Sequence, residues 1–222
     1  MITKYSKLIR ETRQKKGLSQ SDLAIKLGIS RPSYIAIEQG KRELTIRKFK
    51  KLASILNLSF EEVESGESPN YEKYRQMILA FLRLDAKIPK TKLAKLLYFA
   101  DFGWFYSHLE SMSGMQYRKI KYGPVADSYF RIIDDMFDSG EIEQTKDGAM
   151  LISQTRSGAK VHLSKIDKTE KKLIISIEKK WQGKKTNEIV DFTHKQFPYL
   201  YAQDNEIVSY ELFTQENPDE IY

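Results

Sequence analysis

The chain has 222 residues, of which 41% are hydrophobic and 12% aromatic, and this composition predicts folded cores rather than disorder. It contains no cysteine, which excludes disulfides and thiolate metal sites. The first residues lack a signal-peptide core, and nowhere do about eighteen apolar residues run together. We therefore expect a cytoplasmic protein with no membrane partner.

The net charge of +7 is unevenly divided along the chain. Residues 1–66 contain fourteen Lys and Arg against seven Asp and Glu, whereas residues 67–222 contain twenty-three of each kind. All of the excess positive charge therefore lies in the first third of the chain. This division predicts one part that binds a polyphosphate and another part without that requirement.

The first third has the pattern of a helical bundle. Its expected helices cover residues 5–16 and 46–56 and two short segments within residues 20–40, with a short fifth helix opened by a capping box of Ser59 and Glu62. Gly28 breaks the chain after the second helix, and Ser30 is the expected N-cap of the third. Pro32 fits the first turn of that helix, and Gly40 ends it. Two short helices with a tight turn between them predict a helix-turn-helix.

This region, roughly residues 5–63, resembles the phage-repressor, or Cro-like, helix-turn-helix family. The motifs that carry the resemblance are Gly17-Leu18-Ser19-Gln20, Leu23-Ala24, Gly28-Ile29-Ser30 and Ile37-Glu38-Gln39-Gly40-Lys41. The resemblance implies binding to double-stranded operator DNA as a homodimer, with half-sites about one helical turn apart.

The resemblance also implies which residues would contact DNA. Gln20 and Ser30 would bind phosphates at the ends of the two helices, and Arg31, Pro32 and Ala36 would face the bases. The last two have no side-chain hydrogen-bond donor, so base reading would depend mainly on Arg31.

Further DNA contacts are expected beside Arg31 and after the third helix. Ser33 or Tyr34 would help Arg31 to read bases, and Lys41 and Arg42 would hold the DNA backbone.

Family members often pair an arginine of the first helix with the glutamate that ends the third helix. Here these residues would be Arg13 and Glu38. A glutamate at that position opposes the helix dipole and, near phosphates, needs a compensating cation. The alternative is that both are solvated surface charges.

Residues 64–70 carry Gly, Pro and two Ser and have no large apolar side chain. This is the composition of an exposed joint between domains. We therefore expect two domains, residues 1–66 and residues 71–222.

The second domain is expected to be mostly helical. A helix begins at Tyr71, and residues 92–109 are apolar nearly all round, which is typical of a helix buried at the centre of a domain. Thr91 is the expected N-cap of that central helix. Gly123 and Pro124 predict the start of another helix, since proline is favoured in a first helical turn.

The rest of the second domain alternates helical and extended patterns. The expected elements are a hairpin of residues 141–144 and 149–153, a helix over 168–181 with a capping box of Asp167 and Glu170, a helix over 186–194 capped by Thr186, and a strand over 206–213. The expected fold class is mainly α (α+β): a five-helix helix-turn-helix bundle followed by a mostly helical domain with a small β-hairpin.

Three short motifs of the second domain, in this order and spacing, resemble the Panacea, or SocA-like, antitoxin domain over roughly residues 71–213. They are Lys95-Leu96-Leu97-Tyr98-Phe99-Ala100, Tyr122-Gly123-Pro124-Val125 and Phe192-Thr193-His194. The resemblance implies an antitoxin that neutralises a cognate protein toxin by direct contact. We place candidate partner-binding residues at Tyr98, Tyr122, Gly123 and Pro124.

The sequence contains no constellation typical of an enzyme. Its three histidines are not spaced like metal ligands, and it has neither a glycine-rich phosphate loop nor a nucleophile elbow. His194 is the best lone candidate for a general base, although a structural histidine is the commoner case. Asp134, Asp135 and Asp138 fit a solvated helix face better than a cation site. We expect no catalytic residue, metal or cofactor.

Three functions remain open from the sequence. The chain is an antitoxin that binds its toxin and represses its own operon, a transcription factor that senses a small ligand or a protein, or a protease adaptor that delivers a bound toxin. The adjacent gene discriminates between them, because a small lethal product favours the antitoxin classes and a metabolic operon favours the sensor.

Overall fold

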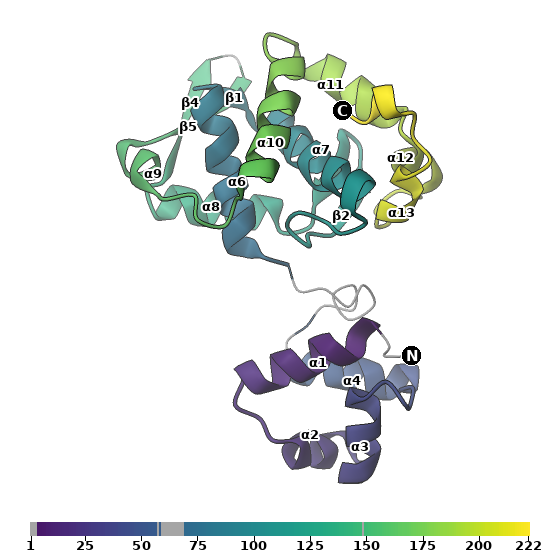
Figure 1. Ribbon diagram of the computed structural model, residues 1–222. Helices are drawn as coiled ribbons and strands as arrows, with labels where there is room; N and C mark the ends of the chain where they lie inside the picture. The colour runs from purple at the N-terminus through teal and green to yellow at the C-terminus, as the bar shows by residue number, and fades with distance from the viewer. Residues whose placement is uncertain (1–3, 57, 59–68, 148) are drawn as a thin grey trace. The chain divides into compact units, whose positions relative to one another are not determined.

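The computed structural model describes residues 4–56, 58, 69–147 and 149–222. It divides into two compact units, Met1–Pro69 and Asn70–Tyr222 (Figure 1). The sequence placed the domains at residues 1–66 and 71–222, and these exact boundaries stay a prediction. The expected short helix after Ser59 lies outside the described residues.

The described part of the N-terminal unit is a bundle of helices. These are α1 (Lys4–Lys15), α2 (Gln20–Leu27), α3 (Arg31–Glu38) and α4 (Ile46–Leu56). Their apolar stripes meet in one core that includes Ile9, Leu23, Tyr34 and Leu52. The four helices predicted from periodicity before residue 57 are confirmed.

The turn between α2 and α3 forms as its residues dictate. Gly28 adopts a left-handed conformation, with φ of 66°, and its N–H closes the end of α2. The hydroxyl of Ser30 accepts a hydrogen bond from the N–H of Ser33 and caps α3. Ser19 and Asp22 form a capping box at the start of α2, which fixes the first residue of this helix. The helix-turn-helix prediction is confirmed.

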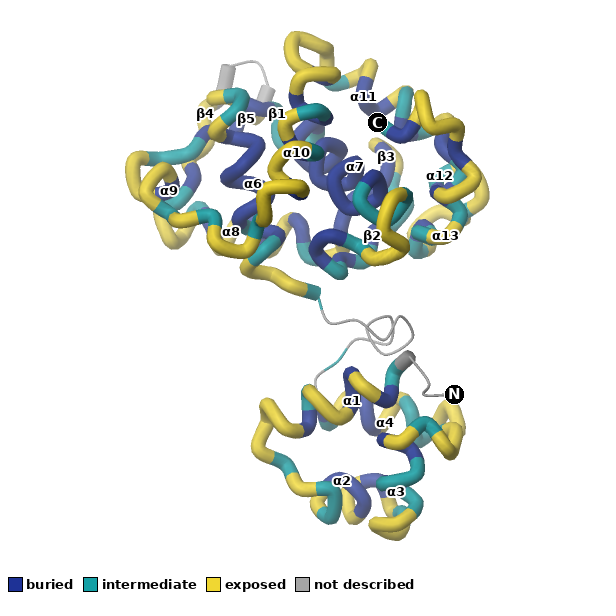
Figure 2. The backbone as a smooth tube through the Cα atoms, in the orientation of Figure 1, coloured by how far each residue is buried: buried dark blue, intermediate teal, exposed yellow. Residues whose placement is uncertain are grey.

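The C-terminal unit is built around a central helix, α7 (Lys90–His108). Every residue from Lys92 to Gly103 is buried, so Figure 2 shows most of α7 in dark blue. Helices that pack on it are α6 (Tyr71–Leu84), α10 (Lys168–Trp181), α11 (Thr186–His194) and α13 (Tyr210–Phe213). The prediction that this helix is buried at the centre of the domain is confirmed.

Two small antiparallel sheets flank the helices. In the first, the strand order is β1 (Ile88–Pro89), β5 (Ala149–Gln154) and β4 (Ile142–Asp147). The second sheet pairs β2 (Tyr117–Ile120) with β3 (Gly123–Ala126). The remaining helical segments are α8 (Tyr129–Asp138), α9 (Arg156–Lys160), α12 (Phe197–Tyr201) and a short 3-10 turn, η1 (Pro218–Glu220). The mainly α fold with small strands is confirmed, including the hairpin of β4 and β5.

The expected helix start at Gly123 and Pro124 is wrong, because both residues belong to strand β3 and α8 begins only at Tyr129. A proline is accepted there because of its partner, Lys119. The backbone N–H and C=O of Lys119 bond to Glu206 and Asn205 on the other side of β2. Lys119 and Pro124 therefore form a non-hydrogen-bonded pair that needs no N–H from proline.

Three smaller expectations at element ends are also wrong. Thr91 is not a cap, because α7 begins at Lys90 directly after strand β1. Thr186 is the first residue of α11, and Lys185 occupies the N-cap position. Residues 206–213 form no strand: Ile207 makes one bridge to Arg118, and the chain then turns into α13. In contrast, the capping box of Asp167 and Glu170 on α10 is confirmed.

None of the helices in the described part of the chain combines the length and the apolar character that crossing a membrane requires.

Candidate functional site

The N-terminal unit carries a buried polar cluster behind α3. The guanidinium of Arg13 on α1 donates to both carboxylate oxygens of Glu38, at 2.6 Å from Nε to Oε1 and 3.2 Å from Nη2 to Oε2. The Tyr34 hydroxyl donates to Oε1 at 2.8 Å, and the Gln20 amide donates to Oε2 at 3.0 Å. The predicted pair of Arg13 and Glu38 is confirmed, and it ties α1, α2 and α3 together.

The charge on Glu38 is stabilised despite its burial. Burial pushes the pKa of Glu38 upward, but the hydrogen bonds from Arg13, Gln20 and Tyr34 hold it below its usual value. Only 3% of the Glu38 side chain is exposed, against 10% for Arg13. The carboxylate at the end of α3 is therefore compensated within the unit and does not face DNA phosphates unpaired.

Tyr34 was expected to help in reading bases, and the structure corrects this. Its side chain is fully buried in the core, and its hydroxyl is bonded to Glu38. The reason is its position on α3, where it lies on the same face as the buried Ile37 and Glu38. Tyr34 therefore supports α3 from behind and is not available to a base edge.

The exposed start of α3 holds a second hydrogen-bonded group. Ser33 Oγ accepts from Ser30 Oγ at 2.9 Å and from Arg42 Nη1 at 2.7 Å. The Arg42 guanidinium from the loop after α3 is thereby held beside the first turn of α3. Both candidate DNA contacts, Ser33 and Arg42, lie on one surface.

The other DNA-binding residues predicted from the sequence are distributed as follows. Arg31, Pro32, Lys41 and Arg42 are exposed together with Ser30, whereas Gln20, Ser33 and Ala36 are half-buried. The side-chain amide of Gln20, which was expected to bind a phosphate, donates a hydrogen bond to Glu38 in this structure. DNA contact by these residues stays a prediction.

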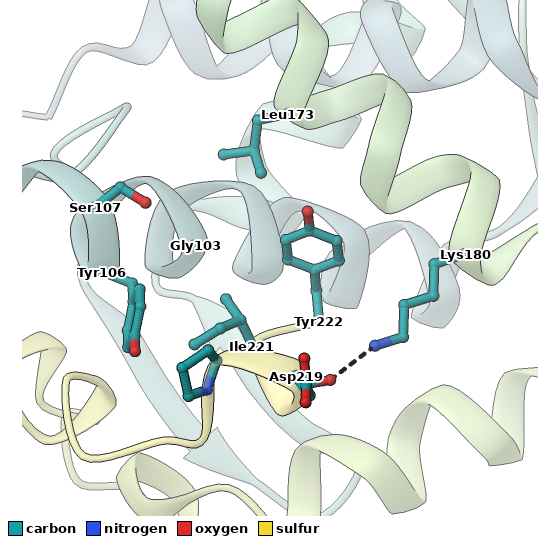
Figure 3. Close-up of a pocket in the computed structure, with 9 residues that line it drawn as sticks. Gly103, Tyr106, Ser107, Leu173, Lys180, Asp219, Ile221 and Tyr222 are labelled. Atoms are coloured by element: carbon teal, nitrogen blue, oxygen red, sulfur yellow. Dashed lines mark hydrogen bonds between the residues drawn. The ribbon is translucent and has the colours of Figure 1, made fainter.

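A pocket of about 410 Å³ lies where residues 218–222 cross α7 and α10 (Figure 3). The ammonium of Lys180 donates to the backbone oxygen of Asp219 at 3.4 Å and lies 5.7 Å from the centre of the Tyr222 ring. The lining residues are Gly103, Tyr106, Ser107, Leu173, Lys180, Pro218, Asp219, Ile221 and Tyr222. These side chains come from segments far apart in the chain, so no local sequence pattern identifies the pocket.

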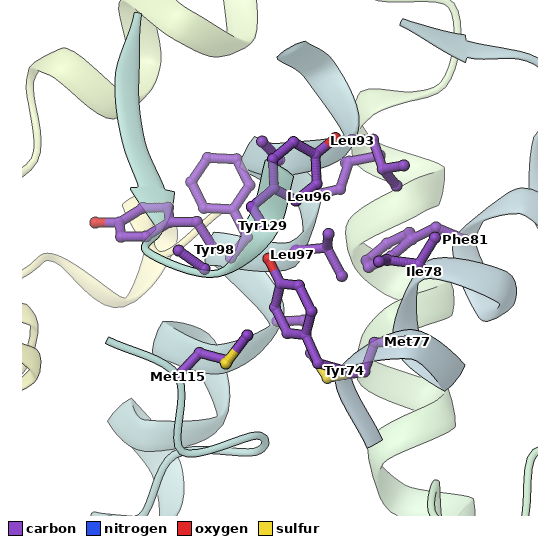
Figure 4. Close-up of a cluster of buried hydrophobic side chains, with 14 of the residues drawn as sticks. Tyr74, Met77, Ile78, Phe81, Leu93, Leu96, Leu97, Tyr98, Met115 and Tyr129 are labelled. Carbon is purple, nitrogen blue, oxygen red and sulfur yellow. The ribbon is translucent and has the colours of Figure 1, made fainter. Parts of the chain in front are cut away.

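Tyr98 was expected to contact a partner, and the structure corrects this as well. Its side chain is fully buried within the cluster of Figure 4, and its ring lies 4.3 Å from that of Phe102, centre to centre. The reason is that α7 is covered on every side, so an aromatic residue at any position in its middle turns enters the core. Tyr98 therefore packs the domain interior.

The three motifs of the C-terminal unit meet at one buried contact. Lys95 on α7 is fully buried, and its Nζ donates to the backbone oxygen of Pro124 at 2.7 Å. Gly123 has φ of +89°, and a Cβ at this residue would lie 2.6 Å from Thr193 Oγ1 and 2.9 Å from Lys95 Cε. The close approach of α7, β3 and α11 thus requires glycine.

The same contact explains the other predicted partner-binding residues. Gly123 and Pro124 are buried, so they position the turn before β3 and do not form an exposed surface themselves. Tyr122 is 57% exposed and lies at that turn. Binding of a partner by Tyr122 stays a prediction, whereas direct contact by Gly123 and Pro124 is excluded by their burial.

Two titratable side chains at this contact, Lys95 and His194, have lowered pKa values. Burial lowers the pKa of Lys95 to about 7. Burial, with a smaller effect from Lys95, lowers the pKa of His194, whose ring stacks on Tyr199 at 4.3 Å between centres. His194 Nε2 is enclosed and has no hydrogen-bond partner among the described residues. These features indicate a packed structural cluster.

Asp101 is a buried acid whose role the sequence patterns did not reveal. It is fully buried on α7 and accepts hydrogen bonds from the Ser113 N–H and hydroxyl, both at 2.6 Å, and from the Tyr117 hydroxyl at 2.7 Å. Burial raises the pKa of Asp101 to about 6. The sequence signal for it was a single acidic residue within an otherwise apolar helix. Its hydrogen bonds hold the segment before β2 and the start of β2 against α7.

Within the described ranges, no group of three or more His, Asp or Glu side chains could hold a metal ion. Asp134, Asp135 and Asp138 are exposed on α8.

Two family models match the chain. Residues 9–63 match the helix-turn-helix family, and residues 93–198 match the family described as "Antitoxin SocA-like, Panacea domain". The second match includes α7, β3 and α11, the elements that meet at Lys95, Gly123 and Thr193.

Two curated relatives are similar to the N-terminal unit. An uncharacterised HTH-type transcriptional regulator of Bacillus subtilis, YqaE, is 38% identical over 64 residues, which cover 29% of this chain and 55% of the relative. An uncharacterised HTH-type transcriptional regulator of Archaeoglobus fulgidus is 36% identical over 55 residues, which cover 25% of this chain and 79% of the relative. The chain thus spans about half the length of the first relative. No solved structure matches the chain.

Proposed function

The chain belongs to the helix-turn-helix family of transcriptional regulators and continues into a SocA-like Panacea antitoxin domain, and on this premise we propose that it is an antitoxin. It neutralises a partner toxin by direct protein contact, without catalysis. It also represses its own operon through the helix-turn-helix, as a homodimer on double-stranded DNA.

The observation that carries the proposal is the meeting of the three Panacea motifs at a single buried contact. Lys95, Gly123 and Thr193 are far apart in the chain, yet they fix the geometry of one turn. A contact of this kind keeps a surface rigid, and rigid surfaces lose less entropy when a partner binds.

The repressor half of the proposal is supported by the N-terminal unit. Residues 1–66 hold the whole charge excess of the chain, and the exposed Arg31, Lys41 and Arg42 lie on or beside α3. Positive charge around a helix-turn-helix is the electrostatic requirement for binding the DNA backbone.

The test is co-expression of the adjacent gene with the full chain, scored by growth and by co-purification. We expect the adjacent product to be toxic alone and harmless beside the full chain. The double variant Arg31→Ala with Lys41→Ala should still rescue growth, because it changes only the DNA surface. The same variant should fail to shift the upstream DNA in a gel titration that the wild type shifts. An adjacent product that is harmless alone, or that the chain neither rescues nor binds, contradicts the proposal.

Ligand-regulated transcription is a second candidate, and the pocket beside α7 and α10 favours it. Its volume of about 410 Å³ lies within the range of small-molecule sites, roughly 300–1,000 Å³. This candidate replaces the antitoxin if the adjacent gene encodes a metabolic enzyme and its small substrate releases the chain from DNA.

A further inference from the structure

Helix α10 presents an outward face of lysines. Its exposed residues, none of them acidic, are Lys168, Thr169, Lys171, Lys172, Ile175, Lys179 and Lys180 (Figure 2). At about 3.6 residues per turn, residues 168, 171, 172, 175 and 179 fall within about 100° of the helix surface. We call Lys168, Lys171, Lys172 and Lys179 the lysine stripe. Within the described part of the chain, no ion pair joins the stripe to an acid.

The C-terminal unit is divided in charge although residues 67–222 are neutral in sum. Helix α10 packs on α6 and α7, and these three helices contain eleven Lys and Arg against four Asp and Glu. The other residues of 67–222 contain twelve basic and nineteen acidic side chains. Of the four acids, Asp101, Glu170 and Glu178 are buried. The lysine stripe therefore lies in a region of net positive charge.

The acidic side chains that border α10 do not cancel this charge. The Asp167 carboxylate accepts hydrogen bonds from the N–H groups of Thr169 and Glu170, and Glu170 is paired with Lys73. When the bordering segments are included, basic side chains still outnumber acidic ones by fifteen to ten. The added acids are Asp85, Glu110, Asp167, Glu188, Asp219 and Glu220, and the added lysines are Lys87, Lys165, Lys184 and Lys185.

Helix stability alone does not favour the lysine stripe. Lys168 is the first residue of α10, where a cation opposes the positive end of the helix dipole. Lys168 and Lys172 are four residues apart on the helix, a spacing at which like charges repel each other. A bound polyanion would offset both of these unfavourable contributions.

We propose that the lysine stripe is a second DNA-binding surface, which holds the phosphate backbone of duplex DNA without reading its bases. This inference rests on the repressor half of the proposed function and adds a contact to it. From Lys168 to Lys179 the stripe is about 16 Å long, a length over which duplex DNA carries roughly ten negative charges. Because both units belong to one chain, DNA that the helix-turn-helix holds is at a high local concentration for α10.

Duplex DNA fits the stripe better than other anionic partners do. Lysine is depleted at the cores of protein interfaces, where aromatic side chains are enriched, and the stripe has no aromatic residue. A membrane surface would require an exposed apolar face, whereas the apolar face of α10 is buried. Single-stranded RNA binds largely through bases stacked on aromatic rings, which the outward face of α10 lacks. An acidic toxin is the competing ligand that the experiment examines.

The test titrates the full-length chain with its upstream DNA and with a duplex of random sequence, at several salt concentrations. We expect Lys172→Gln with Lys179→Gln to weaken binding to both duplexes by the same factor, on the order of tenfold. The slope of log K against log salt should become shallower by about 1.8, because two phosphate contacts are lost. Lys172→Arg with Lys179→Arg keeps both charges and should bind like the wild type.

The matched control removes the same charge from elsewhere on the C-terminal unit. Lys121 and Lys195 are exposed, and neither lies on α6, α7 or α10. We expect Lys121→Gln with Lys195→Gln to leave the affinity for DNA and the salt slope unchanged. The midpoint of urea unfolding should stay close to that of the wild type in every variant, because all altered side chains are exposed.

Two results overturn the inference and leave operator binding standing. One is wild-type affinity and salt slope in the stripe variant, and the other is an equal loss in the stripe and control variants. Loss of affinity for the adjacent gene product, with DNA binding unchanged, also overturns it and assigns the stripe to an acidic toxin.

The two duplexes separate this inference from the proposed function. If the wild type shifts both equally and the stripe variant has the shallower salt slope, operator recognition fails and the second DNA surface is supported. If the wild type shifts neither duplex, the repressor half of the proposed function fails and this inference fails with it.

Discussion

Glu38 shows how one side chain can serve both stability and the DNA surface. It ends α3, where its negative charge opposes the helix dipole. Arg13, Tyr34 and Gln20 all donate to it, so the carboxylate stays ionised although only 3% of its side chain is exposed. The orientation of α3 therefore depends on a cluster that lies away from the proposed DNA face.

We predict that Arg13 and Glu38 are energetically coupled. Arg13→Met and Glu38→Gln each leave the other group buried without its partner, so the double variant should be more stable than the sum of the single losses implies. The expected coupling is on the order of 1–3 kcal/mol. Thermal unfolding followed by far-UV circular dichroism measures it.

Tryptophan fluorescence supplies the control for this cycle. Trp104 and Trp181 both lie in the C-terminal unit, so their unfolding transition should be unchanged in all three variants. Losses that simply add would mean that the two side chains do not interact.

Lys95 predicts a pH dependence of stability. Its pKa falls from about 10.5 to about 7 on folding, because burial disfavours its charged form. Between these values the unfolded chain binds one more proton than the folded chain, so stability rises with pH. Below about pH 7 both states are protonated, and the slope from this group disappears.

The measurement compares urea unfolding of the wild type and Lys95→Met by tryptophan fluorescence at several pH values above 7. The stability of the wild type relative to the variant should increase by up to about 1.4 kcal/mol per pH unit. Parallel pH profiles would show that Lys95 keeps the same protonation in both states.

At the scale of elements, the β2–β3 turn is tightly constrained by the side chains of α7 and α11. We predict that Gly123→Ala destabilises this unit by more than Gly140→Ala. Both glycines have positive φ, which costs about 1–3 kcal/mol for another residue. Only at Gly123 would the new Cβ also collide with Thr193 and Lys95, whereas Gly140 has open space.

Urea unfolding of the two alanine variants, followed by tryptophan fluorescence, isolates the effect of crowding. We expect the loss for Gly123→Ala to exceed that for Gly140→Ala by at least about 1 kcal/mol. Equal losses would mean that the surrounding side chains move aside freely.

The same turn shows why a local pattern can mislead. Glycine followed by proline fits the first turn of a helix, and it also fits a strand residue that has no hydrogen-bonded partner. Pro124 is such a strand residue, because the backbone N–H and C=O of its partner Lys119 form hydrogen bonds to residues 206 and 205 instead. That choice depends on a segment that follows Lys119 by some eighty residues in the sequence. The hydrogen bond from Lys119 Nζ to the backbone oxygen of Ala202 joins the same two regions.

At the scale of the whole molecule, the division of charge matches the division of families. The helix-turn-helix match and the charge excess both fall within residues 1–66, and the antitoxin-like match falls within residues 67–222, which contain equal numbers of acidic and basic side chains. Composition by region was sufficient to find this organisation, because net charge is a sum over residues and does not depend on their packing.

The sequence by itself determined the features that depend on near neighbours in the chain. Helix periodicity, the Gly28 and Ser30 caps, the Asp167 capping box and the β4–β5 hairpin all arise from residues within a few positions of one another. The pair of Arg13 and Glu38 was found through the family resemblance.

Only the tertiary structure decided which side chains are exposed and which distant segments meet. Tyr34 and Tyr98 have the chemistry of contact residues, but the helices around them place both in the core. Lys95, Gly123 and Thr193 meet because α7, β3 and α11 pack together, and α12 adds Leu200 and Tyr201 beside the turn. Burial is a property of the packed chain, so no local pattern can specify it.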